Sequence, residues 1–153
     1  MAVGPVKTGL RNYLRTSDGL RPADSVTVRS AVIAPDEFNP AADTIVLGNV
    51  STSQDQAGLM GRSETTTLTC WVIVTRAGGD ETAVETVRDR AEAIMALVED
   101  ALDANPSAGG AVPAPGQIGV ATSSLEESPA DLEGMALRRA ELQFTLSWTS
   151  HQV

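Results

Sequence analysis

The stretch from Thr65 to Asn105 constrains the fold of this 153-residue chain more than any other part of the sequence. It begins with TTTLTCWVIVTR, in which apolar and polar residues alternate with the two-residue period of a pleated strand. A Gly78-Gly79-Asp80 corner follows, and then ETAVETVRDRAEAIMALVEDALDAN, whose apolar residues recur at three- and four-residue spacing. We therefore predict a strand, a tight corner and one long amphipathic helix.

The same patterns predict which faces of these two elements are buried. We expect a dry face and a mixed face on the strand, and an apolar helix stripe that packs against the sheet. The dry face consists of Leu68, Cys70, Val72 and Val74, and the mixed face of Thr67, Thr69, Trp71, Ile73 and Thr75. The helix stripe consists of Val84, Val87, Ala91, Ile94, Met95, Val98, Ala101 and Leu102. Asp80 is expected to cap the helix and Pro106 to stop it.

Further elements are predicted on both sides of this stretch. A short opening helix is expected, with an apolar stripe of Val6, Leu10, Tyr13 and Leu14 and with Lys7, Arg11 and Arg15 on its exposed side. Strands are expected over 24–34, 43–50 and 117–125, and in a closing strand where Ala140, Leu142, Phe144, Leu146 and Trp148 face one way. Gly48 is expected to mark a bulge or a close backbone approach. Polar loops are expected over Ser51–Arg62 and Glu126–Gly134.

These elements predict an α+β fold. We expect a mostly antiparallel mixed sheet with one long helix and a short N-terminal helix packed on one face. The length fits one domain over residues 1–153, which is long enough to bury a core.

Composition argues against several classes of function. The net charge of −9 opposes tight binding to nucleic-acid phosphates. No stretch approaches the ~20 apolar residues that cross a bilayer, so no membrane partner is expected. The one cysteine, Cys70, lies on the predicted dry face, and the one histidine, His151, is third from the end. We therefore expect no catalytic residues, metal site or cofactor, and the chain is not expected to be an enzyme.

A resemblance to a known family rests on three segments. They are DTIVLGNV with its glutamine-bearing loop, TTLTCWVIVTRAGGDETAVETVRDRAEAIMALVEDAL, and the closing GMALRRAELQFTLSWTS. In the order of these elements, over about two thirds of the chain, the sequence resembles the tail terminator, or tail completion, proteins of long-tailed bacteriophages. The Pro/Gly/Ala connector over 106–116 departs from that pattern and leaves the order of strands in the sheet open.

The resemblance implies a structural virion protein, assembled in the host cytoplasm and located at the neck of the tail. It implies a hexameric ring of this chain that caps the head-proximal end of the tail tube, stops tube growth and provides the head-tail joining surface. The implied partners are further copies of the chain, the major tail tube protein and the head-tail connector or neck proteins. DNA would pass through the lumen without specific binding, and an acidic wall would not hold it.

Two other functions remain open at this point. A neck or head-completion protein would also form rings and bind the connector. A small ligand-binding or enzymatic α+β domain would need a pocket with convergent ionisable groups, and no such set is evident in the sequence.

The residues expected to form a protein interface lie in the Ser51–Arg62 segment and on the opening helix. They are Gln54, Gln56, Leu59, Met60, Arg62, Arg11 and Arg15. Either the segment is a flexible hairpin tip or it becomes ordered against a partner through Leu59 and Met60. Fixing each backbone residue costs ~1–2 kcal/mol, and burying these two side chains returns roughly 1.5–3 kcal/mol each. We expect contacts with a partner to supply the remaining free energy that ordering the segment requires.

Changing Leu59 and Met60 to Ser, or deleting 56–61, should leave the melting temperature near its original value but abolish ring formation or tube capping. The physical reason is that the two apolar side chains stabilise a contact between molecules rather than the core. Circular dichroism melts and negative-stain images of the variant mixed with tail tubes measure the two effects. Unchanged rings and unchanged capping would show that the segment is only a connector.

Overall fold

The computed structural model describes residues 3–30, 43–56, 62–78, 80–111, 119–132 and 135–152. Within these ranges the chain forms two α-helices, one 3₁₀ turn and five strands. In chain order they are α1 (Val3–Thr16), η1 (Pro22–Asp24), β1 (Val26–Arg29), β2 (Asp43–Gln56), β3 (Arg62–Ala77), α2 (Glu81–Ala104), β4 (Gly119–Leu132) and β5 (Met135–Gln152).

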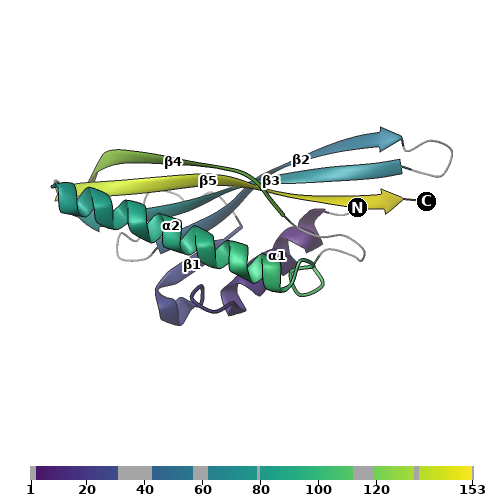
Figure 1. Cartoon of the computed structure of the whole chain (residues 1–153), viewed down its shortest axis with the longest axis horizontal. Helices are drawn as coiled ribbons and strands as arrows, with labels where there is room; N and C mark the ends of the chain where they lie inside the picture. Colours follow the sequence, from purple (N-terminus) through teal and green to yellow (C-terminus); the bar gives the residue numbers. More distant parts are fainter. Residues whose placement is uncertain are drawn as a thin grey trace.

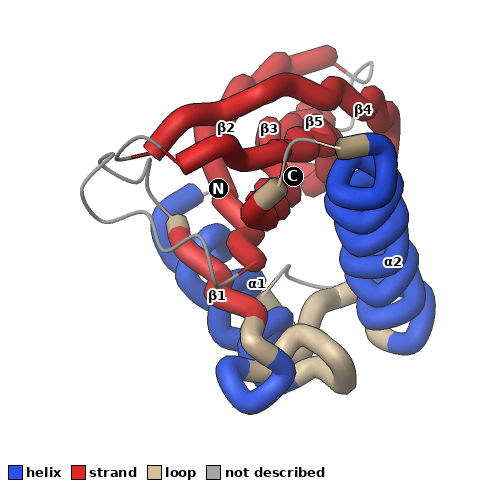
Figure 2. The backbone as a smooth tube through the Cα atoms, turned by 90° about the vertical axis from the view of Figure 1, so that its left-hand side faces the viewer, coloured by secondary structure: helices blue, strands red, loops and turns tan. Residues whose placement is uncertain are grey.

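The five strands form one sheet in the order β1-β2-β3-β5-β4. β1 runs parallel to β2, whereas the pairs β2–β3, β3–β5 and β5–β4 are antiparallel. Figure 2 shows both helices on the same side of this sheet, with α2 packed on β3, β5 and β4 and α1 on β1 and β2. The predicted α+β fold, a mostly antiparallel mixed sheet with two helices on one face, is therefore confirmed.

The core lies between α2 and the paired strands β3 and β5. Leu68, Cys70, Val72 and Val74 of β3 are all 0% exposed, which confirms the predicted dry face. Their partners across the strand pair are Leu146, Phe144, Leu142 and Ala140, which are also buried. The prediction for the closing strand is confirmed as well. One residue of the predicted mixed face of β3 differs from the prediction, because Thr75, near the end of the strand, is buried.

Helix α2 begins where the sequence predicts. The Asp80 carboxylate accepts a hydrogen bond from the backbone N–H of Ala83 at 2.9 Å, which satisfies one of the free donors of the first turn. The buried stripe is Ala83, Val87, Ala91, Ile94, Met95, Val98 and Leu102. Val84 and Ala101 of the predicted stripe are half-buried, and of the two only Ala101 packs against the core cluster, so the prediction was wrong for Val84. The helix is turned slightly about its axis, so that Ala83 faces the corner at Gly78 instead.

Helix α1 lies on the same face of the sheet as α2 and packs on β1 and β2. Its residues Val6, Leu10 and Leu14 are buried, as the apolar stripe predicts. The fourth stripe residue, Tyr13, is half-buried, and its hydroxyl donates a hydrogen bond to the Ala101 carbonyl oxygen at 2.5 Å. This bond joins the two helices.

The strands extend further than the sequence indicates. The predicted loop over Ser51–Arg62 is wrong for most of its length, because β2 continues to Gln56 and β3 begins at Arg62. The predicted loop over Glu126–Gly134 is wrong in the same way, since β4 continues to Leu132. Both segments are polar, so their sequence lacks the apolar alternation of a half-buried strand, and pairing with neighbouring strands decides their structure. β1 is shorter than the predicted 24–34, of which 31–34 lie outside the described residues.

Gly48 lies at an irregularity in the β2–β3 pair, as expected. The register shifts between Leu47 and Val50, which is the pattern of a β-bulge. A Cβ atom at Gly48 would lie 2.3 Å from the Trp71 ring and 2.8 Å from the Thr69 carbonyl oxygen. Glycine is therefore required here because the Trp71 indole lies over its backbone, on the sheet face that the helices leave open.

Changing Ile94 to Asp should unfold the protein, because it buries a carboxylate in the 0% exposed centre of the α2 stripe. We expect a loss of more than about 4 kcal/mol, a large part of the ~5–15 kcal/mol that stabilises a typical domain. Urea unfolding followed by circular dichroism measures it. The matched control is Ala93→Asp, one position along the helix and exposed, which should change little. Equal stability of both variants would contradict the packing described here.

Candidate functional site

Three strands of the sheet extend past both helices at one end of the molecule (Figure 1). We call this end of the sheet the β-wing, and it consists of residues 50–56 of β2, 62–68 of β3 and 146–152 of β5. Only its outer part lies beyond the helices, because Leu68 and Leu146 belong to the buried core. Three predicted interface residues lie in it, with Gln54 paired with Glu64 and Gln56 paired with Arg62. Leu59 and Met60 lie outside the described residues. Gln54, Gln56 and Arg62 therefore lie on paired strands rather than in a loop.

Both outer strands of the β-wing have an edge that pairs with no described strand. On one side, β1 pairs only with Asp43–Val46 of β2. On the other side, the β4–β5 pairing starts with Gly119 opposite Ser147, so β5 beyond that point has no described neighbour there. Unpaired strand edges present rows of N–H and C=O groups that readily bind another strand.

The two faces of the β-wing differ in exposure. On the helix side, Glu64, Thr66 and Trp148 are at most 5% exposed. The open face presents small hydroxyl side chains, among them Ser51, Ser53 and Thr149, which are exposed. The hydroxyls of Thr65 and Thr149 lie 3.3 Å apart across the β3–β5 pair. The described part of this open face is thus mostly polar and uncharged.

The basic stripe of α1 faces the β1–β2 side of the sheet. Lys7 donates to the Gly48 carbonyl oxygen at 2.8 Å, and Arg15 donates twice to the Val28 carbonyl oxygen, at 3.0 and 2.8 Å. Arg11 is held by longer bonds, 3.4 Å to the Ser30 hydroxyl and 3.5 Å to the Asn12 side chain. Of the two predicted interface arginines, Arg15 thus stabilises β1, whereas Arg11 is more weakly bound.

A buried ion-pair cluster, which sequence reasoning missed, joins the sheet to α2. The Asp43 side chain is 2% exposed, and each of its oxygens binds a different arginine. Oδ1 accepts from Arg76 of β3 and Oδ2 from Arg90 of α2, both at 2.7 Å. The partners stand 33 and 47 positions from Asp43, and no short motif marks such a spacing. A carboxylate at the start of an apolar strand was the only available signal.

Cys70 is the only thiol of the chain, and it is buried in the core. Burial raises the pKa of the Cys70 thiol to about 12, against smaller opposing effects of the Gly48 backbone and the Lys7 ammonium group. A thiolate is the reactive form of cysteine. Cys70 therefore packs as a small apolar side chain at neutral pH.

Among the described residues, no group of three or more His, Cys, Asp and Glu side chains is placed to hold a metal ion. Nor is any helix in the described ranges long and apolar enough to cross a membrane.

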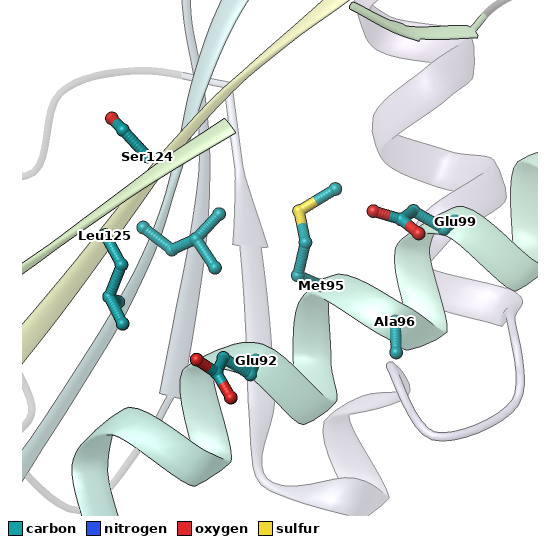
Figure 3. A pocket seen from close by; sticks show the side chains of 7 residues that line it. Glu92, Met95, Ala96, Glu99, Ser124 and Leu125 are labelled. Atoms are coloured by element: carbon teal, nitrogen blue, oxygen red, sulfur yellow. The ribbon is translucent and has the colours of Figure 1, made fainter. Parts of the chain in front are cut away.

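A shallow groove lies between α2 and β4, at the opposite side of the sheet from β1 (Figure 3). It has a volume of about 310 Å³. Met95 of α2, Leu125 of β4 and Leu142 of β5 form its apolar part. Glu92 and Glu99, two turns apart on α2, flank Met95 in this view. The groove combines an apolar floor with an acidic rim.

Changing Asp43 to Ala should destabilise the protein by an amount near the lower end of the ~3–5 kcal/mol typical of a broken buried ion pair. The reason is that Arg76 and Arg90 lose their shared carboxylate, and they remain only 33% and 31% exposed. Chemical denaturation measures the change. Asp18→Ala is the control, because its pair with Arg21 is exposed and should contribute under about 1 kcal/mol. Equal effects of the two substitutions would show that the buried cluster is not stabilising.

No protein-family model matches the chain, and the search of curated proteins returns no significant match.

Proposed function

We propose that this chain is a structural virion protein that forms a ring, in the manner of the phage tail terminators it resembles. The ring, proposed as a hexamer, caps the head-proximal end of the tail tube, stops tube growth and offers a docking surface to the connector or neck proteins.

The β-wing is the observation that carries this proposal. Each of its outer strands has an edge without a described partner, and its outer part projects past both helices (Figure 1). Natural proteins usually block such edges, because an unpaired edge recruits other chains. At the β1 edge, Arg15 binds the Val28 carbonyl oxygen and thereby blocks it. Among the described residues, the sheet edge is thus open at the β-wing and blocked at β1, which supports a role in directed assembly.

The arrangement of layers and the charge also support the proposal. The resemblance implies a sheet backed by helices, and this is the layer order of the fold. The net charge of −9 suits a ring through which DNA passes, because an acidic surface makes few of the counterion-releasing contacts that retain DNA.

The purified full chain should bind one end of tail tubes built from the major tail protein, and negative-stain images measure this. The variant Ser51→Lys/Ser53→Lys places two charges on the exposed face of the β-wing and should lower the fraction of capped tubes. The control Ala93→Lys adds a charge to the exposed face of α2 and should leave capping unchanged.

Two outcomes would reject the tail-terminator function. Binding along the whole tube, or no binding to tubes at all, would contradict capping. Binding to purified connector rings without any binding to tubes would identify a neck or head-completion protein instead.

A further inference from the structure

The described residues carry opposite charges at the two sides of the sheet. Residues 3–30, which form α1, η1 and β1, contain five basic and two acidic residues, a net charge of +3. Helix α2, which packs on β4 at the other side, contains seven acidic and two basic residues, a net charge of −5. We call these two regions the basic side and the acidic side.

The two sides meet within one molecule, because the Tyr13 hydroxyl of α1 donates to the Ala101 carbonyl oxygen of α2. No ion pair between described residues joins them, however. Arg21 pairs with Asp18, Arg88 with Asp89 and Arg90 with Asp43 of the sheet. Charge on each side is therefore available to attract an opposite charge on another molecule.

The groove between α2 and β4 gives the acidic side a shape as well as a charge. Its floor of Met95, Leu125 and Leu142 is apolar, and a charge-flanked apolar groove fits a basic amphipathic surface. Among the described residues, neither Glu92 nor Glu99 makes an ion pair, although both stand at the groove. Their charges are thus not compensated by described side chains.

We propose that this groove binds the basic side of a second copy of the chain, head to tail. A contact between two different surfaces of the same chain is heterologous, and it closes into a ring when the rotation between copies allows. The inference rests on the proposed ring-forming function and names the interface that such a ring uses. The candidate donors on the basic side are Arg11, whose bonds at 3.4 and 3.5 Å are long, and Arg21, whose side chain is 53% exposed.

Reciprocal charge reversal tests this interface with full-length protein. Glu92→Lys/Glu99→Lys makes the groove basic, and Arg11→Glu/Arg21→Glu makes the basic side acidic. Each variant alone should self-associate at least roughly tenfold more weakly than the wild type in sedimentation velocity at low salt, because like charges then face each other. An equal mixture should recover association, since each reversed surface meets a complementary one on the other variant. Added salt should weaken the wild-type contact.

The matched control is Asp89→Lys/Asp100→Lys, which makes the same charge change on exposed α2 positions that do not line the groove. It should self-associate like the wild type, and circular dichroism melts should show that all variants are folded. Failure of the mixture to recover association, equal loss in the control, or a wild type that stays monomeric at millimolar concentration would overturn the inference. Charge-dependent self-association without tube capping would uphold this interface and reject the proposed function. Tube capping that is unchanged in the charge-reversed variants would uphold the proposed function and reject this interface.

Discussion

Burial of the α2 stripe against β3 and β5 is the interaction on which the rest of the structure depends. Fully burying one Val, Leu, Ile or Met side chain contributes roughly 1.5–3 kcal/mol, and α2 buries such residues at positions 87, 94, 95, 98 and 102. The opposite partners come from two strands that are adjacent in space but separated by the whole of α2 and β4 along the chain. The long helix therefore covers, with one apolar stripe, two paired strands that are distant in sequence.

Polar contacts add direction to this apolar packing. Apolar burial is not directional, so a helix can slide or turn on a sheet at small cost. The Asp43 carboxylate receives one arginine from β3 and one from α2, which sets the position of the helix relative to the sheet. The Tyr13 hydroxyl does the same between the two helices. Together these contacts fix the position of α2 relative to the sheet and to α1.

The same layout leaves the surfaces that we assign to assembly. Because both helices lie on one face, no described helix covers the opposite face of the sheet. Because β1 is short and β4 begins at Gly119, the outer strands of the β-wing keep open edges among the described residues. The net charges of +3 and −5 then differ between the two sides of the sheet. A fold with two unlike sides is suited to head-to-tail assembly, whereas a two-fold contact would use the same surface twice.

The sequence by itself determined the elements whose pattern reflects burial. The dry face from Leu68 to Val74, the Asp80 cap and the α2 stripe could all be predicted, because period and capping are local properties. Only the tertiary structure decided the strand order, the extension of β2 to Gln56 and of β4 to Leu132, and the Asp43 cluster. Polar strands are held by pairing with their neighbours, and an ion pair forms between residues 33 or 47 positions apart only when the fold brings them together. Neither strand pairing nor a long-range ion pair produces a periodic pattern in the sequence.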